Sequence, residues 1–335
     1  MGTSLSIINA AERIYISGCF AIPGPLGWFG DAPEAANMLR RLVHSVRAFR
    51  RELARPQVPP PQAPAIGLAL GGGFARGLAH IGVLKVLEEE KIPIRFVAGT
   101  SVGAIIGAAY CSGISAREME EIASLVRFKD FARWTLSRLG FASNDRMRTF
   151  LEQTLRLSTF EELKIPLAVT ATEFVTGDAV VFRSGPLVDA VRASCAYPGI
   201  FLPVEVDGKL LVDGMLAHGV PTIPVREMGA NRVIAVYLNS QWGNLRGPRH
   251  VFDVIGQCFS IAQQKMCGPW QAAADLVITP DVRGFSYDSF ERAAELRQAG
   301  EEVTRRAMPT IREWIHAPAP VPAVSVAPEV SPASS

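Results

Sequence analysis

Short apolar runs alternate along the chain with longer segments in which apolar residues recur every three or four positions. The short runs predict strands at 65–70, 94–98, 167–171, 180–183, 204–206, 210–212 and 233–238. The periodic segments predict helices at 78–91, 104–111, 117–128, 145–156, 187–194, 251–264 and 290–315. Strand and helix alternate from the start of this region, which is the order of a parallel sheet with right-handed crossovers. The pattern therefore predicts an α/β fold.

Proline marks the limits of this region. Residues 56–64 contain five prolines, and residues 317–335 contain five more with Glu329 as their single charge. Proline blocks helices and removes backbone donors, so both stretches predict extended linker or tail. We therefore expect an N-terminal extension at 1–64, an α/β domain at 65–316 and a disordered Pro/Ala-rich tail at 317–335.

The extension contains a predicted basic amphipathic helix at 38–55. Apolar residues recur at helical spacing from Leu39 to Leu53, with five arginines among them: Arg40, Arg41, Arg47, Arg50 and Arg51. One interpretation places this helix in a membrane interface, which Trp28 and Phe29 upstream would also suit. The other packs it on the α/β domain with its arginines in water. Both interpretations stay open.

The chain is apolar for its size, with 48% hydrophobic residues and a mean hydropathy of +0.19. This composition excludes wholesale disorder and raises the question of a membrane span. The charge-free stretch 97–114 is rich in Gly, Ser and Ala and lacks a basic flank, which favours a buried helix. The N-terminus has no basic start, and Arg13 interrupts its apolar run, so we expect no lipoprotein anchor at Cys19.

The net charge and the cysteine content limit the classes of partner that the protein could bind and the compartment in which we expect it. The net charge of +2 gives no electrostatic reason to propose nucleic acid as a partner. The five cysteines are odd in number and contain no CxxC pair, so neither a zinc site nor a disulfide framework is expected, and we predict no cofactor. Free thiols are typical of a reducing compartment. We expect a cytoplasmic protein. Whether residues 38–55 also contact the inner face of the membrane stays open.

The candidate nucleophile is Ser101, in the sequence Gly99-Thr-Ser-Val-Gly103. This GxSxG element joins a predicted strand to a predicted helix, and Gly99 and Gly103 relieve crowding in the sharp turn. The serine hydroxyl would stand at a helix N-terminus, where the helix dipole favours developing negative charge. The alternative is a serine that only caps the helix.

A glycine-rich loop precedes it, containing Gly71, Gly72, Gly73, Arg76 and Gly77. Arg76 breaks the dinucleotide-binding pattern GxGxxG, and no GK[ST] follows, which leaves nucleotide binding as the weaker interpretation. Beside a serine nucleophile, the loop amides are better interpreted as an oxyanion hole. Arg76 would orient the loop or meet a phosphate headgroup.

A serine nucleophile needs a base. Asp207-Gly208 lies between two short strands, which predicts a hairpin turn for Asp207. Asp213 follows an apolar strand, where a charged side chain has no packing role, and is the better candidate. The histidines remain open: His80 is expected to be structural, and His218 to lie at the rim of the site.

These pieces together resemble the patatin-like phospholipases. The resemblance rests on Gly71–Leu84, Gly99–Ala104, Arg192–Phe201 and Leu211–Gly214, in matching order, and covers about 65–315. It implies a three-layer α/β/α fold and a Ser101–Asp213 dyad without histidine. It also implies hydrolysis of phospholipid or lysophospholipid acyl esters through an acyl-enzyme.

The sequence departs from the family pattern beside the implied base. Met215 stands where the family usually has Gly or Ala, and His218-Gly219 where it often has Asn-Pro. The departures leave the dyad atoms in place and bear on substrate fit. They also keep a second hypothesis open, a weakly active or inactive membrane-associated regulatory protein that retains the fold.

Overall fold

The computed structural model describes residues 64–131, 133–134, 140–239 and 251–316. The chain divides into two units, Met1–Pro59 and Pro60–Ser335, and the described residues all belong to the second. Residues 1–63 of the expected extension at 1–64, which include the helix at 38–55 and Cys19, lie outside the described residues, as does the tail at 317–335.

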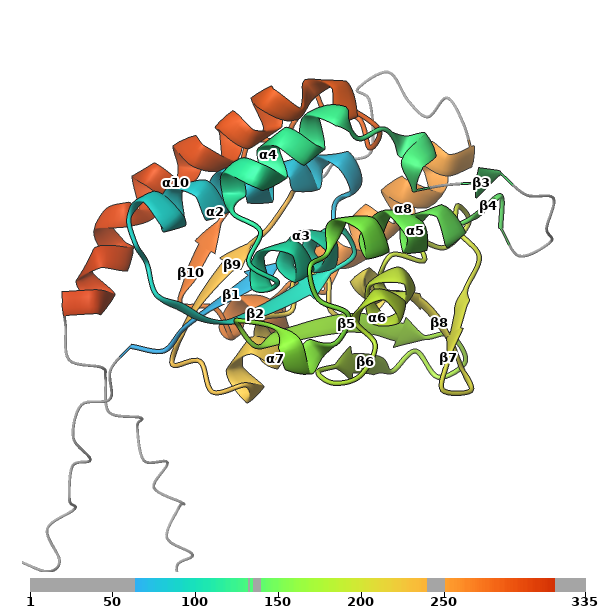
Figure 1. Cartoon of the computed structure of the whole chain (residues 1–335), viewed down its shortest axis with the longest axis horizontal. Coiled ribbons are helices and arrows are strands. Elements are labelled where there is room, and N and C mark those ends of the chain that lie inside the picture. Colours follow the sequence, from blue (N-terminus) through green and yellow to red (C-terminus); the bar gives the residue numbers. More distant parts are fainter. Residues whose placement is uncertain (1–63, 132, 135–139, 240–250, 317–335) are drawn as a thin grey trace, which may run out of the picture. The chain divides into compact units, whose positions relative to one another are not determined.

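An eight-stranded sheet forms the centre of the second unit (Figure 1). Its strand order is β10-β9-β1-β2-β5-β8-β7, and β6 also pairs with β5. The strands are β1 Ile66–Leu70, β2 Ile94–Thr100, β5 Leu167–Glu173, β6 Ala179–Phe182, β7 Val204–Val206, β8 Lys209–Asp213, β9 Arg232–Val236 and β10 Leu276–Ile278. The pairs from β10 to β5 are parallel, so the expectation of a mostly parallel sheet is confirmed.

Two strands, β6 and β8, run against this direction, since each pairs with β5 in antiparallel register. Strand β7 pairs antiparallel with β8 and so runs in the same direction as β5. Only residues 174–178 join β5 to β6, which is too short for the crossover that a parallel pair requires. The hairpin turn predicted at Asp207 is confirmed, since Asp207 and Gly208 have the positive φ values of 49° and 73° that such turns use.

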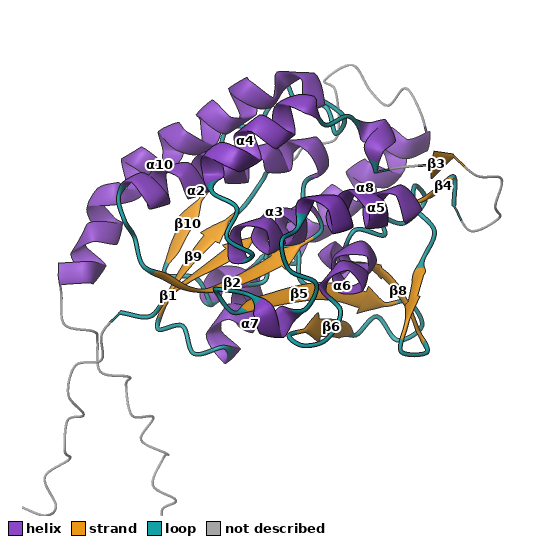
Figure 2. Ribbon diagram, viewed as in Figure 1, coloured by secondary structure: helices purple, strands orange, loops and turns teal. Residues whose placement is uncertain are grey.

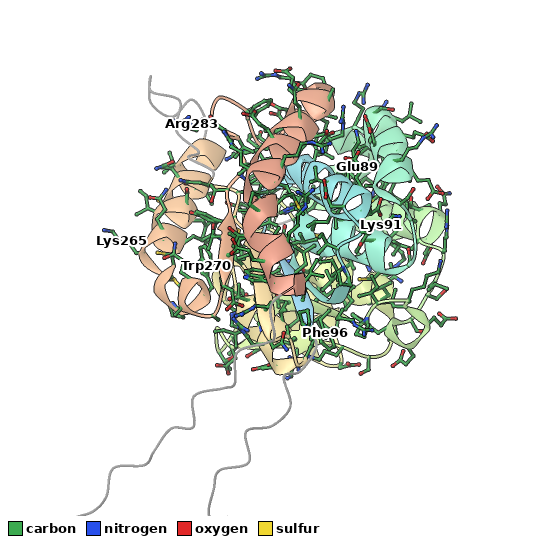
Figure 3. The ribbon with its side chains drawn as sticks, turned by 90° about the vertical axis from the view of Figure 1, so that its left-hand side faces the viewer. Glu89, Lys91, Phe96, Lys265, Trp270 and Arg283 are labelled. Atoms are coloured by element: carbon green, nitrogen blue, oxygen red, sulfur yellow. The ribbon has the colours of Figure 1, made fainter. Side chains whose placement is uncertain are left out.

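Helices cover both faces of the sheet (Figure 2). They are α2 Ala79–Glu89, α3 Val102–Cys111, α4 Ala116–Leu125, α5 Asp145–Thr154, α6 Leu187–Ser194, α7 Thr222–Glu227, α8 Val251–Lys265, α9 Gly268–Ala272 and α10 Ala293–His316. The larger core lies between the sheet and α2, α3, α4, α6 and α10. A smaller core on the other face of the sheet joins α7 to α9. Trp270 of α9, labelled in Figure 3, belongs to this core. The described part of the second unit is a three-layer α/β/α fold.

The predicted elements differ from the observed ones mainly at short segments. The pattern missed β10, α7, α9 and the two-residue strands β3 Arg133–Trp134 and β4 Ala142–Ser143. Segments of two to six residues are too short to display a period. The glycine loop continues into a 3₁₀ turn at Phe74–Leu78, and another 3₁₀ turn, at Phe290–Arg292, precedes α10.

The apolar stretch 97–114 is divided between the end of β2 and α3, and its helix is buried as predicted. Helix α3 has only ten residues. Among the helices of the described ranges, none combines the length and the apolar character needed to cross a bilayer.

Candidate active site

Ser101 stands on the turn between β2 and α3. Its φ of 54° and ψ of −124° lie in a region that non-glycine residues rarely adopt. Gly99 and Gly103 make the turn possible: a Cβ at Gly99 would come within 2.4 Å of Gly103 O, and one at Gly103 within 2.1 Å of Leu70 O. The strained backbone presents the hydroxyl at the carboxyl end of the parallel strands, at the start of a helix.

Two glycines of α3 provide a stability test of this turn. A methyl group at Gly103 would collide with the backbone of Leu70, which cannot rotate away, so Gly103→Ala should destabilise the fold by about 3 kcal/mol or more. Gly107→Ala is the matched control, because its nearest neighbours are side-chain methyls of Leu167 and Val97, both at 3.3 Å. Gly107→Ala should change the free energy of unfolding by no more than about 1 kcal/mol. Denaturant unfolding measures both, and equal losses would contradict the requirement for glycine at position 103.

Ser101 and Asp213 meet across 112 positions of sequence. Ser101 Oγ donates a hydrogen bond to Asp213 Oδ2 at 2.7 Å, and the amide of Met215 donates to Asp213 Oδ1 at 2.9 Å. Asp213 ends β8 and is fully buried, while Ser101 keeps 8% of its surface exposed. Burial raises the pKa of Asp213 to about 7, against the opposing effect of the bonds from Ser101 and Met215. The carboxyl is therefore poised to change protonation near neutral pH.

The glycine loop lies against Ser101, but its amides are used unequally. A Cβ at Gly72 would lie 3.4 Å from Ser101 Cβ. The amides of Gly71 and Gly72 donate to Val236 O at 3.1 Å and Gly219 O at 3.2 Å, so these two residues do not present free donors as expected. Within the described residues the amide of Gly73 has no acceptor.

Gly77 and Arg76, two further residues of the loop, pack against neighbouring parts of the fold. A Cβ at Gly77 would lie 2.3 Å from Val102 Cγ1, so this glycine lets the loop approach the start of α3. Arg76 is buried, and burial lowers its pKa to about 10 despite the nearby Tyr197 phenol. At the start of α3 itself, no acceptor among the described residues takes the amide hydrogens of Val102 and Gly103. With Gly73, they are amides of the glycine loop and the Ser101 turn that have no acceptor among the described residues.

No histidine of the described residues bonds to Ser101 or Asp213. His80 is completely buried, and its Nε2 bonds to Gly71 O at 2.8 Å. Burial lowers its pKa to about 4, so the ring is neutral and braces the glycine loop. His218 contributes its backbone carbonyl, which accepts from Thr100 Oγ1 at 2.7 Å. The structural role expected for His80 is consistent with these contacts.

Ser194 is a partner of the nucleophile turn that the sequence patterns did not reveal. The amide of Ser101 donates to Ser194 Oγ at 2.8 Å, which takes this donor away from any oxyanion. Ser194 ends α6 and is fully buried. Ser194 belongs to the segment 192–201, which carried part of the family resemblance. The sequence therefore marked this segment as important, but it did not indicate what Ser194 does.

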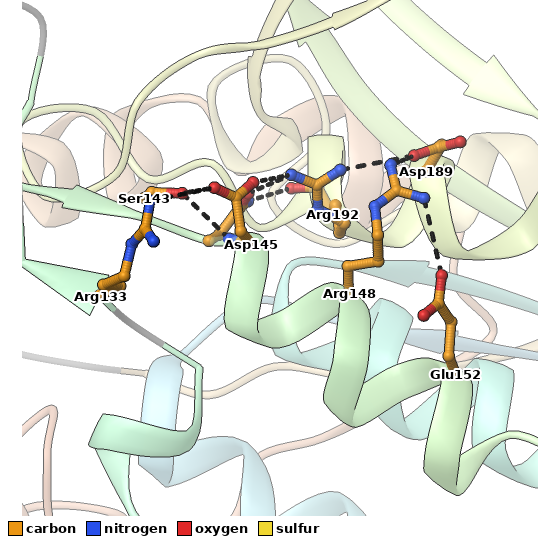
Figure 4. A network of polar contacts seen from close by, with 8 residues as sticks. Arg133, Ser143, Asp145, Arg148, Glu152, Asp189 and Arg192 are labelled. Atoms are coloured by element: carbon orange, nitrogen blue, oxygen red, sulfur yellow. Dashed lines mark hydrogen bonds and ion pairs between the residues drawn. The ribbon is translucent and has the colours of Figure 1, made fainter.

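A polar network holds α6 in place (Figure 4). The Arg192 guanidinium donates to Asn144 Oδ1 at 3.1 Å and Asp145 Oδ1 at 2.9 Å, and it faces Asp189 at 3.5 Å. In return, Asn144 Nδ2 donates to the backbone carbonyl of Arg192 at 3.0 Å. The network ties α6 to the start of α5, and so it fixes Ser194 beneath Ser101.

Comparison with known proteins identifies this arrangement. Residues 68–226 match the family described as patatin-like phospholipase, a range that includes the glycine loop, Ser101, Ser194 and Asp213. These residues form a patatin-like phospholipase domain. The three-layer fold agrees with that of VipD from Legionella pneumophila, whose crystal structure matches at a TM-score of 0.51 and 13% identity. That match covers 75% of this chain and 67% of VipD, and it concerns the fold alone.

Two curated relatives share more sequence with the patatin-like domain. An uncharacterized NTE family protein of Mycobacterium tuberculosis is 34% identical over 201 residues, covering 56% of this chain and 51% of that protein. Lysophospholipase NTE1 of Mycosarcoma maydis is 31% identical over 231 residues, covering 66% of this chain and 12% of the fungal protein. The chain thus spans about half the length of the mycobacterial relative and a small part of the fungal one.

An apolar cavity of about 110 Å³ opens beside Ser101 in the patatin-like domain. We call it the Ser101 cavity. Its walls come from α3, α4 and α5, with side chains such as Ile105, Ile122 and Phe150. Among the described lining residues none is charged, and Ser101, Thr154 and Cys195 are the polar or thiol exceptions. Nor do the described ranges contain a group of three or more His, Cys, Asp and Glu placed to hold a metal ion.

Proposed function

We propose that this protein is a serine acyl-ester hydrolase of lipids, of the phospholipase A or lysophospholipase type. The observation that carries the proposal is the 2.7 Å hydrogen bond from Ser101 Oγ to a buried carboxylate, at the edge of an uncharged apolar cavity. The names of the relatives support the lipid class, since the family is described as patatin-like phospholipase and one relative as a lysophospholipase.

The proposed reaction proceeds in two stages. Asp213, when ionised, accepts the proton of Ser101 Oγ as that oxygen attacks the ester carbonyl. The carbonyl oxygen becomes an oxyanion, and the amides of Gly73, Val102 and Gly103 are the donors that we assign to it. The ester C–O bond breaks, and the alcohol leaves with the proton held by Asp213. Water, deprotonated by Asp213, then releases the fatty acid and restores Ser101.

We assign the acyl chain of the substrate to the Ser101 cavity. Hydrocarbon gains free energy when it leaves water for an apolar surrounding, whereas a charged headgroup would be desolvated there without a partner. The absence of charged groups among the described lining residues therefore favours the chain over the headgroup.

Fatty-acid release from phospholipid and lysophospholipid in detergent micelles tests this proposal. A labelled fluorophosphonate, which reacts with activated serines, should modify the protein at Ser101. Release of fatty acid together with this labelling is expected. A folded protein that neither releases fatty acid nor reacts with the probe would favour the regulatory alternative, in which the fold is kept without turnover.

We further propose that residues 1–64 form an extension outside the catalytic domain at 65–316, and that its basic helix at 38–55 contacts anionic membranes.

Replacing Arg40, Arg47 and Arg50 with glutamate should reduce co-sedimentation with anionic vesicles several-fold, because attraction to anionic lipid scales with basic charge. Hydrolysis of a soluble short-chain ester should be unchanged. Replacement of the same three arginines with lysine is the matched control. If the glutamate variant sedimented with vesicles as the wild type does, the alternative interpretation would be favoured, in which the helix packs on the α/β domain.

A further inference from the structure

A second cavity, of about 240 Å³, lies beside Gly72 and has no role in the reaction proposed above. We call it the Gly72 cavity. Its walls come from the glycine loop, from the segment after Asp213, and from α7, α8 and α9. None of the described residues lines both this cavity and the Ser101 cavity. Met215, His218 and Gly219, the three departures from the family pattern, all line it.

The Gly72 cavity adjoins the reacting groups. A Cβ at Gly72 would lie 3.4 Å from Ser101 Cβ and 3.9 Å from Met215 Cβ, so a single glycine lies between the nucleophile and the wall. Met215 bonds through its amide to Asp213 Oδ1, and Gly219 O accepts the amide of Gly72. Substrate atoms next to an ester at Ser101 would therefore lie close to this wall.

The chemistry of the walls favours an uncharged, apolar occupant. Apolar and aromatic side chains dominate, among them Val220, Ile223, Met266 and Trp270. Among the described lining residues there is no Lys, Arg, Asp or Glu. Burial lowers the pKa of His218, so its ring is neutral at pH 7, and the Gln263 amide already donates to Met215 O at 3.3 Å. A phosphate group would lose its hydration here without meeting a charged partner.

We propose that the Gly72 cavity binds the second acyl chain of a diacyl glycerolipid while the chain to be cleaved occupies the Ser101 cavity. This inference rests on the proposed function and specifies its substrate class. Ser101 lines one apolar cavity, and Gly72, which lies against Ser101, lines a second and separate one. This arrangement matches a substrate with two apolar chains joined near the ester. A monoacyl lipid would leave the Gly72 cavity empty, so the cavity selects for diacyl substrates.

Filling the cavity tests the proposal in the full chain. Ile223 is half-buried in α7, and Ile223→Trp adds a ring to the space that the second chain would use. The substrates are a diacyl phosphatidylcholine, the lysophosphatidylcholine with the same acyl chain, and a short-chain nitrophenyl ester, in mixed micelles of one detergent. We expect kcat/KM for the diacyl lipid to fall tenfold or more. For the other two substrates it should stay within twofold of wild type.

A second variant and a control guard against misfolding. Met266 is 55% exposed and also lines the cavity, so Met266→Trp narrows the space without removing a buried side chain. Val277→Trp, at a partly exposed position of β10 that lines neither cavity, is the control and should leave all three rates unchanged.

The outcomes separate the inference from the proposed function. Equal losses on all three substrates, or no selective loss on the diacyl lipid in either cavity variant, would overturn the assignment of the cavity while leaving the hydrolase intact. If the wild-type protein hydrolyses none of the three substrates, the proposed function fails, and the inference fails with it.

Discussion

Ser101→Ala should lower fatty-acid release by about 10⁴–10⁶-fold and abolish labelling by a fluorophosphonate. Among the described residues, Ser101 supplies the hydroxyl that bonds to the Asp213 carboxylate, at 2.7 Å, and removing it leaves no atom there to carry the acyl group. The substitution removes one buried hydroxyl and its bond, so the fold should persist. The measurement is kcat/KM on a short-chain ester and on a phospholipid, with the residual rate compared with the buffer blank.

Ser112→Ala is the matched control for this variant. Ser112 is also buried, follows the last residue of α3, and donates to the carbonyl of Ala109 at 2.8 Å. It should lower stability by about 1 kcal/mol while leaving the rate within twofold. If the Ser101→Ala protein retained a substantial part of wild-type activity, or if both variants lost activity alike, Ser101 would not be the nucleophile.

The sequence predicted the central layers of the fold because their elements are long and simply patterned. Parallel strands buried on both faces appear as continuous apolar runs, and β1, β2 and β5 do so. The turn at Ser101 was also predictable from its local GxSxG pattern, in which Gly99 is required by its contact with the start of α3 and Gly103 by its close approach to Leu70 at the end of β1. The sequence singled out Asp213 because an acid that ends an apolar strand has no packing role of its own, and the fold places its carboxylate against Ser101.

Contacts between distant parts of the chain were not predictable in this way. The expectation that the loop amides form an oxyanion hole does not hold for the amides of Gly71 and Gly72, because β9 and the segment after Asp213 supply carbonyls that accept their hydrogens. Ser194 was missed for the same reason, since its role exists only once α6 lies beneath the turn. A glycine-rich sequence shows that the backbone can approach closely, but it does not show which atom it approaches.

Burial of Asp213 connects the stability of the fold to its chemistry. A carboxyl without a counter-ion among its bonded partners is costly to ionise in the protein interior, and its two hydrogen bonds offset only part of that cost. The same burial places the pKa where a general base is most useful at neutral pH. Catalytic competence and stability should therefore move in opposite directions when this residue is changed.

Asp213→Asn should accordingly lower kcat/KM by about 10²–10⁴-fold and remove its pH dependence near neutrality. In the wild-type protein kcat/KM should rise with pH and level off above about 7, because only the ionised carboxylate accepts the Ser101 proton. Asparagine cannot accept that proton at any pH, although its side chain can still bond to Ser101 and Met215. Initial rates on a short-chain ester from pH 5 to 9 measure both effects, and a wild-type midpoint retained in the variant would exclude Asp213 as the base.

The same substitution should stabilise the folded protein above neutral pH. Asp213 has a pKa of about 7 in the fold against 3.8 as its ordinary value, so between these pH values the folded state holds a proton that the unfolded chain has released. The free energy of unfolding of the wild type therefore falls as pH rises through this window, and the fall is complete above 7. The Asp213→Asn protein does not lose this stability, because asparagine does not ionise. The difference in the free energy of unfolding between the variant and the wild type should therefore grow from zero near pH 4 to as much as about 4 kcal/mol at pH 8.

Asp207→Asn, at the exposed hairpin turn whose positive φ asparagine also tolerates, is the control and should show no such pH-dependent gain in stability. Denaturant unfolding at pH 4, 6 and 8 compares the three proteins, and a stability difference independent of pH would contradict a buried, ionisable Asp213.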